Sequence, residues 1–69
     1  MIVYKRELDA DDLNNLGDEE ELIYYQSDEV AITILIAKDC FVARKKRIFE
    51  NKLIEESVLK TIEEIMEFI

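Results

Sequence analysis

The segment from Val30 to Ala37 constrains the fold more than any other part of the chain. Seven of its eight residues are apolar, the exception being Thr33, and its even positions carry the bulkier β-branched side chains. Alternation of this kind predicts a central β-strand with a helix packed against the bulky face. The segment is far shorter than the ~20 apolar residues that a membrane-spanning helix needs.

The length and the cysteine content limit how such a chain can be stabilised. Its 69 residues allow one domain, expected to span residues 1–69. One cysteine cannot form an internal disulfide, and without histidine no His/Cys cluster can hold zinc. The lone cysteine, and a first segment without the long apolar core of a signal peptide, predict a cytoplasmic protein. Stability is then expected from tight packing, self-association or a partner.

The N-terminal part is expected to form a strand and a short helix. The mixture of β-branched and aromatic residues from Ile2 to Leu8 predicts the first strand. Asp9 is a suitable N-cap for a helix over residues 10–16, because Asp12 follows three residues later. Gly17, the only glycine, is expected to close this helix in a left-handed conformation.

Two more strands and a second helix follow. Residues 22–25 predict a strand, and another is expected to begin at Cys40 after a turn. Apolar residues then recur at helical spacing, which predicts an amphipathic helix from about residues 53–57, with Ser57 or Asn51 as its cap. The predicted apolar stripe contains Ile54, Val58, Ile62, Ile65 and Ile69, with Leu59 and Met66 beside it.

Together these elements predict an α+β fold. We expect a small antiparallel sheet of three or four strands, with the C-terminal amphipathic helix packed on one face, in the order β-α-β-β-β-α.

Few residues offer catalytic or ligand chemistry. The chain lacks histidine, and Cys40, beside an aromatic residue at a strand start, is expected to be a buried, inert thiol. A single glycine excludes the phosphate-cradling loop and the dinucleotide fingerprint. A calcium loop counted from Asp9 fails at Leu13, where an oxygen ligand belongs, and at Asn14, where glycine is needed. We therefore expect no enzyme activity, no cofactor and no metal.

The basic run Arg44-Lys45-Lys46-Arg47 is the main cluster of positive charge. On a strand its side chains alternate between both faces, so neither face can be core there. The run is expected to project past the sheet or to lie on a solvated edge. Direct nucleic-acid binding through it is disfavoured by the net charge of −8.

The acidic surplus has two interpretations. Residues 7–37 carry ten acids and no base, and the charge serves either solubility alone or a negative surface that fits a basic partner. The composition resembles that of the acidic nucleic-acid mimics that phages make to block host DNA-binding or defence enzymes. The residues expected to bind such a partner are Asp11, Asp12, Asp18, Glu19, Glu20, Glu21, Glu63 and Glu67.

The sequence thus predicts a small, non-catalytic binding protein that modulates or inhibits a larger, basic-surfaced protein, for instance a nucleic-acid-handling enzyme. The alternative is a homodimeric or accessory structural subunit whose acidity serves only solubility. In that case the C-terminal residues Met66, Phe68 and Ile69 are expected to form an apolar dimer seam. No membrane partner is expected.

Overall fold

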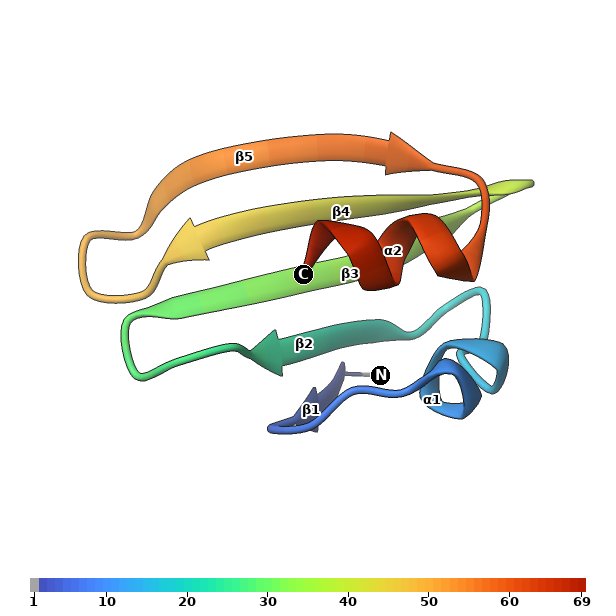
Figure 1. Ribbon diagram of the computed structural model, residues 1–69, viewed down its shortest axis with the longest axis horizontal. Coiled ribbons are helices and arrows are strands. Elements are labelled where there is room, and N and C mark those ends of the chain that lie inside the picture. Colours follow the sequence, from blue (N-terminus) through green and yellow to red (C-terminus); the bar gives the residue numbers. More distant parts are fainter. Residues whose placement is uncertain (1) are drawn as a thin grey trace.

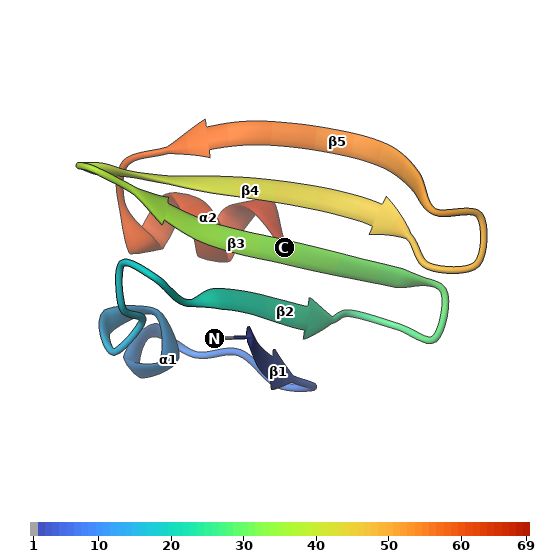
Figure 2. The same ribbon diagram turned by 180° about the vertical axis from the view of Figure 1, so that it is seen from behind.

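The computed structural model describes residues 2–69, which form one five-stranded sheet with two helices on one of its faces (Figures 1 and 2). The elements are β1 (Ile2–Lys5), α1 (Ala10–Asn14), β2 (Glu21–Tyr25), β3 (Val30–Ala37), β4 (Cys40–Arg47), β5 (Lys52–Leu59) and α2 (Ile62–Phe68). Neither α1 nor α2 has the length and apolarity needed to cross a lipid bilayer. The predicted α+β class, with a C-terminal helix packed on the sheet, is confirmed.

The predicted number of strands and their purely antiparallel pairing are wrong. The strands lie in the order β1-β2-β3-β4-β5, and β1 runs parallel to β2, whereas the other neighbours are antiparallel. A parallel pair needs a long crossover, and residues 6–20 with α1 provide it. The chain order is therefore β-α-β-β-β-β-α. Lys38 and Asn51, with φ of 54° and 48°, take the left-handed conformation in the two turns that flank β4.

The hydrophobic core lies between the sheet and the two helices. In β3 the side chains of Ile32 and Ile34 are fully buried, as the alternation in this strand predicts. Leu13 of α1 and Ile65 of α2 are buried against the same face. Among residues 2–69, the buried cluster contains Leu13, Leu16, Leu22, Ile32, Ile34, Ala43, Leu59 and Ile65.

Helix α1 begins as predicted and ends differently. The Asp9 carboxylate accepts a hydrogen bond from the Asp12 backbone N–H at 3.0 Å, and the Asp12 carboxylate accepts one from the Asp9 N–H at 3.2 Å. This capping box is confirmed. The helix stops at Asn14, and Gly17 has no positive φ, so the prediction of a left-handed closing glycine is wrong. Asn15 ends the helix with its backbone N–H bonded to the Asp11 carbonyl oxygen at 3.1 Å.

The C-terminal helix is shorter than predicted. Residues 52–59 form strand β5, and α2 begins only at Ile62. Its N-cap is Thr61, whose hydroxyl oxygen accepts the Glu64 backbone N–H at 3.2 Å, and not Ser57 or Asn51. The predicted stripe is therefore divided between two elements. Its first members, Ile54 and Val58, are exposed on β5, whereas Ile65 belongs to α2 and is buried between this helix and the sheet.

Opposite charges across from β4 favour a strand over residues 52–59, and Arg44 and Glu56 form an ion pair there. The register places Glu56 opposite Arg44 and Glu55 opposite Lys45. Opposite charges at directly facing positions stabilise a strand pair. A bulge follows, since Lys45 faces Glu55 but Lys46 faces Leu53, so one residue of β5 is extra.

We predict that Ile65→Ala lowers the free energy of unfolding by about 2–5 kcal/mol, because it opens a cavity where α2 meets β3. Phe49→Ala is the control, since the Phe49 side chain is 83% exposed in the β4–β5 turn and its loss should change stability by less than about 0.5 kcal/mol. Urea denaturation followed by circular dichroism measures both values. Equal effects of the two substitutions would contradict this account of the core.

Candidate interaction surfaces

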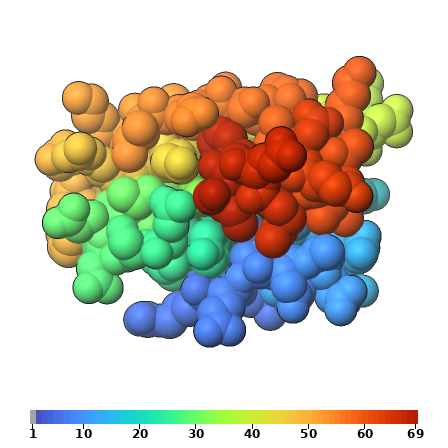
Figure 3. Space-filling view, in the orientation of Figure 1, coloured from blue at the N-terminus to red at the C-terminus, as the bar shows by residue number. Residues whose placement is uncertain are grey.

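The two helices bring most of the predicted acidic residues to one side of the molecule. Helices α1 and α2 contact one another on the same face of the sheet, and Figure 3 shows their surfaces meeting there. We call this surface the acidic helix layer. It consists of Asp11, Asp12, Asp18, Glu19, Glu20, Glu63, Glu64 and Glu67. Residues 9–20 and 61–69 contain no lysine or arginine, so the layer supplies no positive charge of its own.

Asp12 is the most constrained member of the acidic helix layer. Its carboxylate lies 3.1 Å from the Lys5 ammonium nitrogen and also accepts the Asp9 backbone N–H. The hydrogen bond from Lys5, followed by the one from Asp9, lowers the pKa of Asp12 below its ordinary value of 3.8. Asp12 is thus held as an anion and joins α1 to the end of β1.

The turn between α1 and β2 carries a second group of acids, of which Glu20 is held in place by hydrogen bonds. The Glu20 carboxylate accepts the Gly17 backbone N–H at 3.1 Å, and the Glu20 N–H bonds back to the Gly17 carbonyl oxygen at 3.1 Å. A Cβ at Gly17 would lie 2.8 Å from this carboxylate oxygen, so the absence of a side chain there lets Glu20 fold inward. Asp18 and Glu19 remain exposed at the tip of the turn.

Helix α2 adds Glu63 and Glu67, which are both exposed and one helical turn apart. Like charges at this spacing repel each other weakly, and no folding requirement for the pair is visible, because Ile65 makes the buried contact of the helix. Glu21, in contrast, is not part of the acidic helix layer. It lies in β2 beside the buried Leu22, so its side chain is on the opposite face of the sheet.

The C-terminal residues predicted to form a dimer seam are largely used within the fold. Phe68 and Ile69 are partly buried and pack against the core. The Phe68 ring also lies beneath the Lys45 ammonium group, 5.2 Å from the ring centroid. Of the three residues, Met66 is the most exposed, at 39%. Little apolar area is therefore left at this end for contact with another chain.

The basic run lies in an inner strand, so its predicted place at an edge or beyond the sheet is wrong. Strand β4 sits between β3 and β5, and its charges are tolerated because partners or solvent reach them on both faces. The Arg44 Nε donates to Glu56 Oε2 at 2.7 Å, and an Arg47 guanidinium nitrogen lies 3.6 Å from the Glu50 carboxylate. Lys45 contacts Phe68. Three of the four bases are thus engaged locally.

The face of the sheet opposite the helices carries no helix or loop of residues 2–69 (Figure 2). We call it the open sheet face. Its larger apolar residues are Ile2, Tyr4, Ile23, Tyr25, Leu35, Val42, Leu53 and Val58. Tyr4 is 59% and Val58 63% exposed, and the Tyr4 and Tyr25 rings stack with centroids 6.1 Å apart.

Sequence reasoning missed this surface. Two signals pointed to it: the continuous apolar run of residues 40–43, which puts apolar side chains on both faces of a strand, and tyrosines placed where they would line one face of two neighbouring strands.

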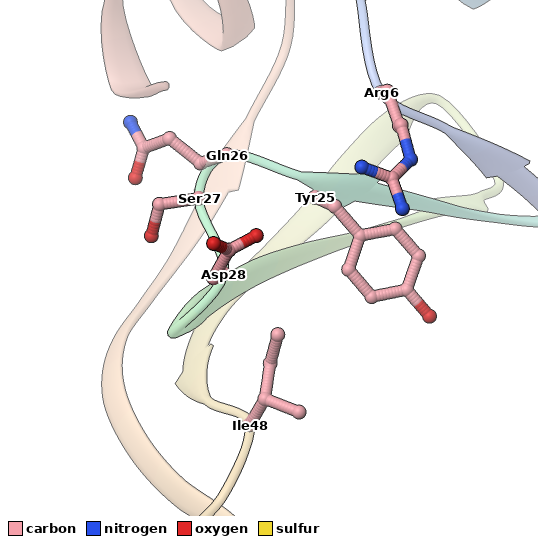
Figure 4. Close-up of a pocket in the computed structure, with 6 residues that line it drawn as sticks. All are labelled: Arg6, Tyr25, Gln26, Ser27, Asp28 and Ile48. Atoms are coloured by element: carbon pink, nitrogen blue, oxygen red, sulfur yellow. The ribbon is translucent and has the colours of Figure 1, made fainter.

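The molecule also has a hollow of about 410 Å³ at the turn between β2 and β3 (Figure 4). Among the described residues, it is lined by Arg6, Tyr25, Gln26, Ser27, Asp28 and Ile48. The Ser27 hydroxyl oxygen accepts the backbone N–H groups of Glu29 and Val30, both at 3.2 Å, and so shapes the turn. Cys40 lies elsewhere, half-buried, with its thiol donating to the Ala37 carbonyl oxygen at 3.1 Å. Neither place combines a nucleophile with an orienting base.

Comparison with protein-family models, with curated proteins and with solved structures found no match to this chain. Among residues 2–69, no group of three or more acidic or cysteine side chains is arranged to hold a metal ion. The acidic helix layer is distinguished by its charge, and the open sheet face by its exposed apolar side chains.

We predict that Asp12 contributes to the pH dependence of stability. Because its pKa is lowered in the folded state, its contribution is present above the unfolded value near 3.8 and is lost as the pH falls through the folded value. Asp12→Asn should therefore flatten the loss of stability in acid. Urea denaturation at several pH values below neutrality measures this. Asp11→Asn, which leaves the contact between Lys5 and Asp12 intact, is the control. If the free energy of unfolding of Asp12→Asn fell with pH in parallel with that of the wild type, the contribution assigned to Asp12 would be contradicted.

Proposed function

We propose that this protein is a non-catalytic binding protein that uses the acidic helix layer to bind, and thereby modulate or inhibit, a larger protein with a basic surface. One observation carries this proposal. Acids from α1, from the turn 17–20 and from α2, which are far apart in the sequence, are gathered on one side of the molecule, where residues 9–20 and 61–69 provide no base.

The balance of local charges supports a surface that is free to attract a partner. Asp12 is paired with Lys5, but Glu63 and Glu67 have no ion-pair partner among residues 2–69. Arg44 and Arg47 of β4 pair with Glu56 and Glu50 and so do not neutralise the layer. Lys45 is the β4 base that lies beside α2, over the Phe68 ring. A field of one sign raises the association rate with an oppositely charged protein by about 10- to 1000-fold.

A nucleic-acid-handling enzyme fits the description of the partner. Its binding groove is basic because it contacts phosphates, and carboxylates on a folded surface can occupy the same positions. The role proposed here is therefore blockade of such a groove, as in the mimics whose composition this chain resembles.

The alternative proposal, a homodimeric or accessory subunit, is favoured by a different observation. The open sheet face leaves apolar side chains such as Tyr4 and Val58 in solvent. Exposed apolar area of this kind on a small protein is typical of a protein contact.

The experiment uses the tagged chain to capture proteins from its native cell, followed by binding kinetics with the captured partner. The Glu63→Lys/Glu67→Lys variant should lower the association rate by about tenfold or more, and raising salt from about 50 to about 200 mM should weaken binding by the wild type. The matched control is Asp28→Lys/Glu29→Lys, which changes the net charge equally but lies in the β2–β3 turn, away from both helices.

Two results would contradict the proposal. One is a partner whose affinity is the same at both salt concentrations. The other is equal slowing by the two double variants, since the effect would then come from net charge alone and not from the acidic helix layer.

A further inference from the structure

We propose that the open sheet face packs against the same face of a second copy of this chain, with Glu21 of each copy against Lys46 of the partner subunit. This interface is separate from the acidic helix layer, and it differs from the C-terminal seam expected from the sequence.

The first argument is apolar area. The molecule measures 30 by 21 Å across the broad face that contains the sheet. This outline, part of which is apolar, is as large as one side of a small protein interface, about 600 Å² per partner. The centre of the face is lined by Leu35 and Val42, and Ile2, Tyr4 and Val58 are exposed toward its margins. Among residues 2–69 eight residues form the buried core, so burial of this face would add substantially to the stability of the chain.

The second argument is charge, which selects a second copy as the occupant. The strand residues of the open sheet face carry two acids, Glu21 and Glu56, and two bases, Arg44 and Lys46, so their formal charges cancel. The whole chain has a net charge of −8. Two copies therefore repel through the acidic helix layer but can approach through this neutral face, whereas a basic partner gains nothing from it.

The third argument is the arrangement of the two unpaired charges. Arg44 and Glu56 bond to each other, but Glu21 and Lys46 have no ion-pair partner among residues 2–69. Glu21 faces Leu35 of β3, and Lys46 faces Ala31 of β3. Glu21 and Lys46 therefore lie on the two strands that flank β3. Along β3, Glu21 is level with the residue two positions after Thr33, and Lys46 is level with the residue two positions before it.

This placement satisfies two-fold symmetry. In an isologous interface, if residue i contacts residue j of the partner subunit, then j also contacts i. Consider a two-fold axis that lies in the plane of the interface, passes at Thr33 and is perpendicular to the line from Glu21 to Lys46. Rotation about this axis places Glu21 of each copy against Lys46 of the partner subunit, so both ion pairs form at once. Neighbouring strands are about 4.8 Å apart, and successive side chains on the same face of a strand are about 6.7 Å apart. With these spacings the axis runs from Thr33 toward Val58. The strands of the two sheets then cross steeply, as in orthogonal sheet packing.

The test is the mass of the purified chain in solution, measured by sedimentation equilibrium from micromolar to millimolar concentration. The expected mass is twice the 8.2 kDa of one chain. Glu21→Lys and Lys46→Glu should each raise the dimer Kd by about tenfold or more, because both pairs then become like-charged. An equimolar mixture of the two variants should form a heterodimer, and the double variant E21K/K46E should recover the homodimer.

The controls separate a specific contact from net charge. Glu21→Lys brings the net charge closer to zero, so general repulsion alone would strengthen its association, in the opposite direction to our expectation. Glu29→Lys, in the β2–β3 turn, and Lys52→Glu, on the helix side of the sheet, make the same charge changes at exposed positions outside the face and should leave the Kd unchanged. Val58→Lys, on the two-fold axis, should also dissociate the dimer, and circular dichroism checks that each variant is folded.

Several results would overturn the inference. A wild-type chain that stays monomeric up to millimolar concentration excludes the dimer. A dimer insensitive to Val58→Lys but lost on Met66→Lys places the contact at α2. The Glu63→Lys/Glu67→Lys variant separates this test from that of the proposed function, because it changes the acidic helix layer, should slow binding to a basic partner, and should leave the dimer Kd unchanged.

Discussion

The burial of Leu13 and Ile65 against Ile32 and Ile34 is the contact on which the rest of the structure depends. Helices of five and seven residues are not stable alone in water, so α1 and α2 exist because the bulky face of the sheet holds them. Both helices pack on that one face of the sheet. Since no element among residues 2–69 covers the other face, one-sided packing produces both the acidic helix layer and the open sheet face.

The same packing separates the charges of the chain. The helices and the turn 17–20 face solvent with their acids, whereas the cluster of bases lies in β4 within the sheet. There Arg44 pairs with Glu56 of the neighbouring strand, and Lys45 rests on Phe68 of α2. A chain with net charge −8 thereby acquires one strongly negative side and one nearly neutral side. This division, more than the total charge, makes directed binding a reasonable function.

The parts of the fold that sequence alone predicts are those set by local interactions. The alternation in residues 30–37 and the capping box of Asp9 and Asp12 depend only on near neighbours, and both are present. Strand β5 was not predictable in this way, because Ile54 and Val58 have helical spacing, and only the distant pairing of β4 with β5 favours a strand. The parallel pairing of β1 and the identity of the uncovered sheet face also depend on the whole fold. The acidic surface was therefore foreseeable as a set of residues, and the open sheet face was not.

The two proposed contacts are geometrically compatible. When two sheets pack face to face about 10 Å apart, their helix layers lie on the outer sides of the pair, about 30 Å from each other. Since the Debye length is about 8 Å at physiological ionic strength, repulsion between the two acidic helix layers is largely screened. The dimer would then present two identical acidic surfaces in opposite directions. It would bind two separate basic partners. It would gain avidity only from a partner with two basic sites that can contact both acidic helix layers of the dimer at the same time. Dimerisation therefore leaves the proposed binding surface free and doubles it.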